Sequence, residues 1–123
     1  MIYTVFIDEP NRTIAIKGAG NATTADTLEL ISTQQQTFRE HAGFNLLYDT
    51  TEMEIDSSPA DMVAVATALF EQSETAFGRI AVVVPESREG LARIFTALAH
   101  PHGFNANVFT HISDARSWLG LDR

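Results

Sequence analysis

Two adjacent serines, Ser57 and Ser58, stand where the sequence predicts the start of a helix. They follow Asp56, precede Pro59 and lie beyond an apolar run that ends at Asp49. The first turn of a helix has backbone N–H groups without helical partners and the positive end of the helix dipole, so it attracts anions, phosphate included. The residue types therefore predict a site for an anion, or for phosphorylation of a serine hydroxyl.

Ser58 also has the sequence context of an N-cap, which is a structural role. Pro59 would take the first helical position and Asp61 the third, a short-armed form of the capping box. A capping serine contributes about 1 kcal/mol to helix stability. The cap alone and a regulatory phosphorylation site at Ser58 or Ser57 are both open, and propensity by itself favours the cap.

Carboxylates and glycines near the serines raise two further alternatives. The acidic residues are Asp49, Glu52, Glu54, Asp56 and Asp61. Their spacing lacks the regular order of a calcium loop, so we expect a solvated acidic loop and no metal site. Gly18-Ala19-Gly20-Asn21 lacks the third glycine of a dinucleotide fingerprint and the Gly-Lys-Ser/Thr of a P-loop. A tight turn that uses positive φ is expected there.

No nucleophile–base pair is visible in the sequence. It has neither a Gly-x-Ser-x-Gly elbow nor a His-Glu-x-x-His helix, and it has no cysteine. His100-Pro101-His102 fits the end of a helix better than a metal site. We therefore expect a protein that is not an enzyme and needs no cofactor.

Composition limits the partners and the location of the chain. The 123 residues include 16 acids and 8 bases, for a net charge of −8, with the basic residues scattered. Nucleic acid and anionic membranes are poor partners for such a chain, since phosphate backbones need clustered Lys and Arg. The sequence has no apolar run of about 18 residues and no signal-peptide pattern at its start. A cytoplasmic protein is expected.

Strand-like runs alternate with helical patterns along the chain. The predicted strands are residues 2–8, 12–17, 45–49, 79–84 and 105–110, the first two joined as a hairpin. Four helices are predicted, with Thr23 or Thr24, Ser58, Ser87 and Ser113 as their N-caps. The order ββαβαβαβα implies right-handed crossovers. It predicts one α/β domain over residues 1–123, with a mixed, mainly parallel five-stranded sheet and four helices.

The chain resembles a STAS domain, the fold of bacterial anti-sigma-factor antagonists and sulphate-transporter tails. A hairpin ending at Gly18 leads to Thr24-Ala25-Asp26, where the family has a glycine and a Thr/Ala-rich helix start. Asp56-Ser57-Ser58 is similar to its Asp-Ser-Ser-Gly signature. The closing segments RIAVVVPES and VFTHISDARSWLG are similar to the SpoIIAA-like branch. The resemblance spans essentially the whole chain.

The resemblance implies a phosphorylated serine. In antagonists of this type a kinase-like anti-sigma partner phosphorylates the second serine of the signature, which corresponds to Ser58. The sequence departs from the family at Pro59, where the signature has glycine. Because proline has no N–H, phosphate would have to be held by the N–H groups of Ala60 and Asp61.

The sequence leaves two functions open. The first is a non-enzymatic regulatory module that contacts a protein partner, kinase-like or another regulator, around Asp56–Ser58. The second is a small-molecule-binding domain for a nucleotide or lipid headgroup, with a crevice among Gly18–Asn21, Asp49 and the helix start. Phe70 and Phe77 flank a polar stretch and could form an exposed homodimer contact. A deep apolar pocket would favour the ligand, and a flat acidic helix start would favour the protein partner. The expected partner- or ligand-binding residues are Gly18, Gly20, Asp49, Asp56, Ser57, Ser58, Ala60 and Asp61.

Overall fold

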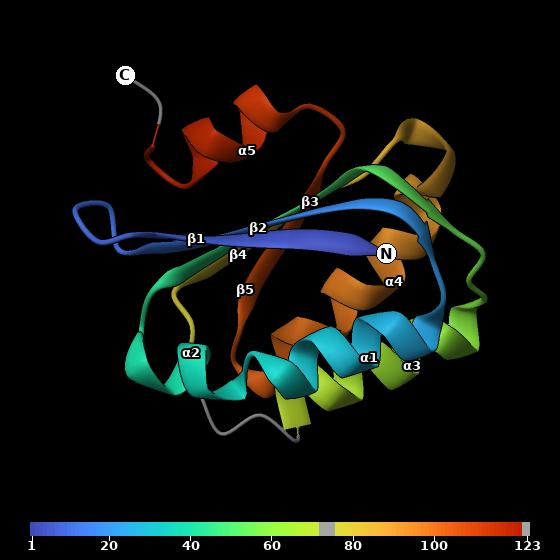
Figure 1. Ribbon diagram of the computed structural model, residues 1–123, viewed down its shortest axis with the longest axis horizontal. Coiled ribbons are helices and arrows are strands. Elements are labelled where there is room, and N and C mark those ends of the chain that lie inside the picture. The colour runs from blue at the N-terminus through green and yellow to red at the C-terminus, as the bar shows by residue number, and fades with distance from the viewer. Residues whose placement is uncertain (72–75, 122–123) are drawn as a thin grey trace.

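A five-stranded sheet with its strands in chain order forms the centre of the protein (Figure 1). The computed structural model describes residues 1–71 and 76–121. β1 (Ile2–Asp8) runs antiparallel to β2 (Thr13–Ala22). β3 (Asn45–Ile55), β4 (Arg79–Val83) and β5 (Asn105–Phe109) continue the sheet in parallel. This confirms the predicted α/β fold with a mixed, mainly parallel five-stranded sheet.

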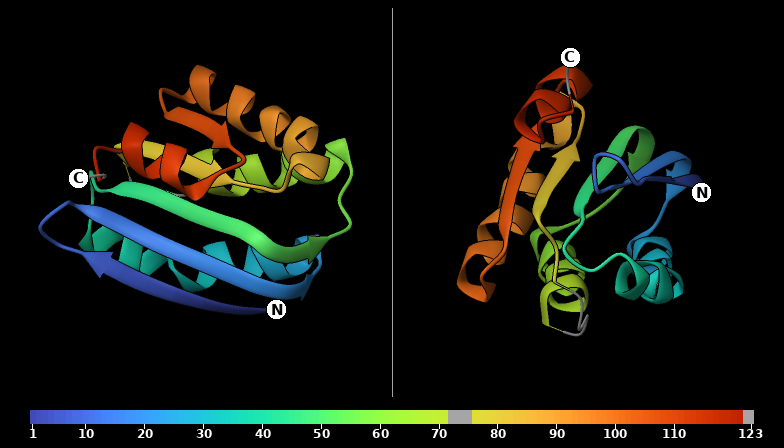
Figure 2. Two further views of the ribbon diagram at one scale, coloured as in Figure 1. Left: turned by 90° about the horizontal axis from the view of Figure 1, so that it is seen from above. Right: turned by 90° about the vertical axis from the view of Figure 1, so that its left-hand side faces the viewer.

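The two faces of the sheet are covered unequally. One face carries α1 (Thr24–Thr33), α2 (Gln35–Glu40), α3 (Pro59–Ala66) and α4 (Glu89–Ala99), whereas α5 (Ile112–Trp118) lies on the other (Figure 2). Right-handed crossovers explain this arrangement, since each parallel strand is followed in the sheet by the next along the chain. The helices that connect them must therefore share a face.

Short turns of other helical types extend two of these helices. α3 continues into a π-helical turn over Thr67–Glu71. A 3-10 turn over Glu86–Arg88 precedes α4, and another over His100–His102 follows it. Gly103 then ends the helix with φ of 82°, as its position after Pro101-His102 predicts.

The larger core lies between the sheet and the α1–α4 layer. Its buried aromatic members include Phe38, Phe70 and Phe95. Phe70 is only 5% exposed and its ring lies 5.1 Å from those of Phe95 and Phe104. Phe77 is half-buried against Phe38. The expected exposed dimer contact at Phe70 and Phe77 is therefore wrong, because both rings contribute to the core.

β2 and β3 are both longer than predicted. Residues 19–22 pair in parallel with residues 52–55 after a register shift between Lys17 and Ala19, so the tight turn expected at Gly18–Asn21 is wrong. Gly20 has φ of 88°, but inside a strand. Gly18 packs so closely on Met53 that a Cβ would overlap the methionine sulfur. The expected acidic loop is thus the exposed edge of β3, which alternates Glu52 and Glu54 with buried Met53.

The helix starts agree with the sequence at two of four places. Thr23 and Ser58 cap α1 and α3, each through a complete capping box. The predicted caps Ser87 and Ser113 are wrong, because α4 and α5 begin after Arg88 and His111 without a side-chain cap. Ser87 lies instead within the 3-10 turn that follows Pro85 and precedes α4. The predicted first helix is divided at Gln34 into α1 and α2.

We predict opposite effects for two alanine substitutions that test this packing. A Cβ on Gly78 would lie 2.5 Å from Asn45 Oδ1 and 3.1 Å from the Gly43 carbonyl oxygen. Asn45 Oδ1 accepts a hydrogen bond from the Arg79 N–H at the start of β4. Gly78→Ala should therefore lower the free energy of unfolding by about 1–3 kcal/mol. Gly90 in α4 has open space, so Gly90→Ala should raise it by about 0.5–1 kcal/mol.

Urea unfolding of both variants and the parent protein measures the difference. Equal or greater stability of Gly78→Ala relative to Gly90→Ala would contradict the close approach of the strand ends.

Candidate functional site

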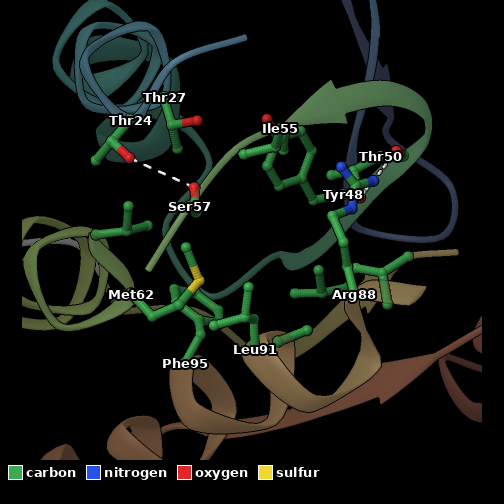
Figure 3. A pocket seen from close by; sticks show the side chains of 14 residues that line it. Thr24, Thr27, Tyr48, Thr50, Ile55, Ser57, Met62, Arg88, Leu91 and Phe95 are labelled. Atoms are coloured by element: carbon green, nitrogen blue, oxygen red, sulfur yellow. Dashed lines mark hydrogen bonds between the residues drawn. The ribbon is translucent and has the colours of Figure 1, made fainter. Parts of the chain in front are cut away.

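A cavity lies between the sheet and the helices, where the carboxyl ends of β3 and β4 meet the starts of α1, α3 and α4 (Figure 3). Open parallel sheets bind ligands at this edge. Its volume is about 90 Å³. Its lining residues are Thr24, Thr27, Tyr48, Thr50, Ile55, Ser57, Met62, Val65, Val82, Val84, Arg88, Leu91, Ala92 and Phe95.

Unequal strand lengths make room for this cavity. β3 pairs with β4 only from Leu46 to Asp49, but it continues along β2 as far as Ile55. The chain leaves the sheet after Val83 and turns into α4, so β4 does not cover the last part of β3. The space beside this uncovered part is bounded by α4 on one side and by α1 and α3 on the other (Figure 3).

Most of the cavity wall is apolar. Ile55, Met62, Leu91 and Phe95 from three different elements meet around it. Ile55, Met62 and Leu91 are half-buried, which places them where the cavity approaches solvent. A volume of about 90 Å³ corresponds to about three water molecules at about 30 Å³ each, so a longer ligand would extend toward the solvent-facing side of the cavity.

At one end of the cavity, Arg88 donates hydrogen bonds to backbone carbonyl groups of β3, as a neighbouring strand would. Its Nη2 donates to the Thr50 carbonyl oxygen at 2.6 Å and to Thr50 Oγ1 at 3.2 Å. Its Nη1 donates to the Met53 carbonyl oxygen at 3.1 Å. The Nε atom is buried and has no partner among the described residues. Burial holds the pKa of Arg88 below its ordinary value, an effect that nearby Tyr48 partly opposes.

Tyr48, a residue of β3, lies beside Arg88. Burial raises the pKa of its phenol to about 12. Its hydroxyl contacts the sulfur of Met53 at 3.7 Å. The tyrosine therefore stays neutral at physiological pH and offers a hydroxyl rather than a charge.

Hydroxyl groups mark the other polar end of the cavity. Thr24 Oγ1 and Ser57 Oγ lie 3.4 Å apart and join the start of α1 to the start of α3 (Figure 3). Thr27, one turn along α1, is buried and also lines the cavity. Ser57 is thus half-buried and faces inward, toward the cavity.

Ser58 lies outside the cavity and caps α3 as predicted. Its Oγ accepts the Asp61 N–H at 3.2 Å, and its own N–H donates to Asp61 Oδ2 at 2.8 Å. This backbone hydrogen bond holds the pKa of Asp61 below its usual range. Asp56, Ser58 and Ala60 are all exposed. The two serines therefore face different surroundings, one the cavity and the other solvent.

Three of the expected site residues lie apart from the serines. Asp49 points to the α5 face of the sheet, where it lines a shallow depression and accepts the Thr51 N–H at 3.0 Å. Gly18 is buried under Met53, and Gly20 lies in β2. The structure does not bring them into one crevice with Ser57, because successive side chains of a strand alternate between faces.

Arg88, Tyr48 and Leu91 were missed by sequence reasoning. The sequence predicts Leu91 only as part of the helix that follows Ser87, and Tyr48 only as part of the strand over residues 45–49. The signal for Arg88 was its position between a parallel strand and the next helix, where ligand residues of open α/β sheets lie. Nothing in the sequence, however, placed it against β3.

The described residues include neither a metal-binding group nor a membrane-spanning helix. Within residues 1–71 and 76–121, no three His, Asp or Glu side chains form a group that could hold a metal ion. None of the described helices is both long and apolar enough to span a bilayer.

Comparison with known proteins identifies the family. The SpoIIAA-like family model matches residues 13–120, and the chain belongs to this family. A similar solved structure is that of an uncharacterized DUF3478-family protein with a SpoIIAA-like fold from Shewanella loihica PV-4. The two share 18% identity with a TM-score of 0.64, over 95% of this chain and 93% of that one. No curated protein matches the chain.

We predict that Tyr48 titrates unusually late and weakens the fold at alkaline pH. Its pKa rises from 10.0 to about 12 on folding, so the unfolded chain loses this proton first. The contribution to stability is complete below pH 10 and falls as the pH rises from 10 toward 12. Tyrosinate absorbance should show a component with a midpoint near 12 that disappears in Tyr48→Phe. The matched variant Tyr3→Phe should keep this component, and its presence in Tyr48→Phe would contradict the assignment.

Proposed function

We propose that the protein is a non-enzymatic binding module of the bacterial cytoplasm that holds a small, largely apolar molecule in the cavity. The observation that carries this proposal is an apolar cavity at the ligand-binding edge of a parallel sheet. A ligand of suitable shape would displace water from the apolar wall and gain about 25 cal/mol for each Å² of apolar surface that becomes buried.

The polar groups of the cavity support binding rather than catalysis. Among the described residues they are threonine and serine hydroxyls, a tyrosine and an arginine, and none of these lining residues is a carboxylate or a histidine. A serine or tyrosine nucleophile needs a base within hydrogen-bond reach. Ser57 has Thr24 as its neighbour instead, and Tyr48 is neutral with a pKa of about 12. Such groups can orient a ligand but are poorly suited to activate one.

A series of 1-alkanols tests the apolar site by calorimetric titration. Each added methylene contributes about 0.8 kcal/mol when buried, so affinity should rise about fourfold per carbon until the cavity is full. Leu91→Trp places a larger side chain in the lining and should weaken binding of 1-hexanol at least tenfold. Ala97→Trp adds the same side chain at an exposed position of α4 and should leave affinity unchanged.

Two results would contradict the proposal. One is the absence of saturable binding across the series in the parent protein. The other is equal affinity of Leu91→Trp and Ala97→Trp, provided that both variants keep a cooperative thermal transition.

A second candidate function is regulatory contact with a protein partner at the start of α3. Asp56, Ser58 and Ala60 form an exposed segment there, and Val63 one turn further is 48% exposed. Ser58 Oγ caps α3 by accepting the Asp61 N–H, and because Ser58 is exposed, a phosphate added there would not disturb the core. The phosphate would lie beside the Asp61 carboxylate, which holds the Ser58 N–H. Repulsion between these charges would weaken the cap and alter this surface.

Intact-mass spectrometry of protein purified from its own host tests the phospho-regulated form. We expect one phosphate, lost in Ser58→Ala and retained in Ser57→Ala, because Ser57 is half-buried and faces Thr24. Phosphate that persists in Ser58→Ala would exclude Ser58 as the acceptor. An unmodified parent protein would count against phospho-regulation while leaving the cavity proposal intact.

A further inference from the structure

Arg88 is a cation at one end of an otherwise apolar cavity. Among the described residues, the ion pairs join Lys17 with Glu52, Arg93 with Glu89, and two histidines with glutamates, and none includes Arg88. Its hydrogen-bond partners are two backbone carbonyls and a threonine hydroxyl, all neutral. The charge of Arg88 is therefore held by dipoles alone.

The guanidinium also has an unused donor. Five N–H groups are available on arginine, and the contacts with Thr50 and Met53 involve only Nη1 and Nη2. Nε is buried without a partner among the described residues and has almost no accessible surface, so a ligand cannot reach it. Nη1 carries two N–H groups, of which one donates to the Met53 carbonyl oxygen. An anion beside this end of Arg88 would accept the second N–H of Nη1 and compensate the charge.

We propose that the ligand is an amphipathic monoanion, of the class of short- and medium-chain carboxylic acids. Its carboxylate would accept a hydrogen bond from the second N–H of Arg88 Nη1, and its apolar tail would lie against Met62, Leu91 and Phe95. This inference rests on the proposed function, since it names the ligand class for the same cavity. Figure 3 shows the guanidinium at one end of the cavity and the three apolar side chains along its wall.

The surroundings favour a monoanion over a phosphate dianion. Among the described residues, Arg88 is the only cationic side chain in the lining. The chain as a whole carries a net charge of −8, which disfavours a second negative charge on the ligand. A single carboxylate neutralises a single guanidinium, whereas a dianion would leave an uncompensated charge in an apolar space. The neutral hydroxyl of Tyr48, beside Arg88, adds a donor that suits a carboxylate oxygen.

Hexanoate and 1-hexanol, compared by calorimetric titration at neutral pH, test the inference. Both have the same six-carbon chain, so their affinities differ through the polar group alone. A charge-assisted hydrogen bond contributes about 1.5–3 kcal/mol, so the parent protein should bind hexanoate at least tenfold more tightly than 1-hexanol. In Arg88→Gln the two affinities should become equal within about threefold, while 1-hexanol still binds.

Arg93→Gln is the matched control for the loss of charge. Arg93 lies on the exposed side of α4 and pairs with Glu89, so its replacement removes one positive charge outside the cavity. This variant should keep the tenfold preference for hexanoate. Loss of the preference in Arg93→Gln would overturn the inference, because the net charge of the protein would then explain it.

The outcomes separate the two proposals. Binding of 1-hexanol with equal or weaker binding of hexanoate overturns the inference and leaves the proposed function standing. Failure of the parent protein to bind either compound overturns both. If Arg88→Gln does not fold, Arg88→Lys keeps the charge but lacks the planar set of guanidinium N–H donors. The preference should then fall at least threefold, and an unchanged preference overturns the inference.

Discussion

Strand β3 continues past the end of β4, and this mismatch in length determines where the cavity lies. β4 pairs with β3 only as far as Val83, so the carbonyl groups of Thr50 and Met53 have no partner on β4, although β2 still lies beside Met53. Arg88 donates to both carbonyls and thereby satisfies backbone acceptors that would otherwise be left unpaired. One side chain at the start of α4 thus permits an incomplete sheet edge beside an apolar space.

The right-handed crossovers determine where the helices of the site lie. Because the strands follow one another across the sheet, α1, α3 and α4 are forced onto one face, with their starts at the carboxyl edge. Two capping boxes fix the first turns of α1 and α3, and the contact between Thr24 and Ser57 joins them. The same helix start therefore serves two surfaces. Ser57 faces the cavity, while Ser58 faces solvent, where a partner or a kinase would meet it.

Local sequence signals predicted the fold and the position of the site better than its chemistry. Period-3.6 patterns, buried strands and the Ser58 cap are encoded within a few residues, so they were found correctly. The extension of β3 was missed because its exposed glutamates resemble a loop, and only pairing with β2 makes them a strand. Arg88 and Tyr48 were missed for a related reason. Their roles arise from contacts between residues more than thirty positions apart, which one sequence does not reveal.

Nuclear magnetic resonance of the methyl groups in the presence of 1-hexanol tests the central claim most directly. The account predicts intermolecular contacts and shift changes at the methyl groups of Ile55, Met62 and Leu91, which line the cavity. The other face of the sheet provides the contrasting outcome, since Ile2 and Ile112 are 77% and 41% exposed there. Changes confined to those two isoleucines, or no changes at all, would contradict the claim that this domain binds a small apolar molecule between its helices and its sheet.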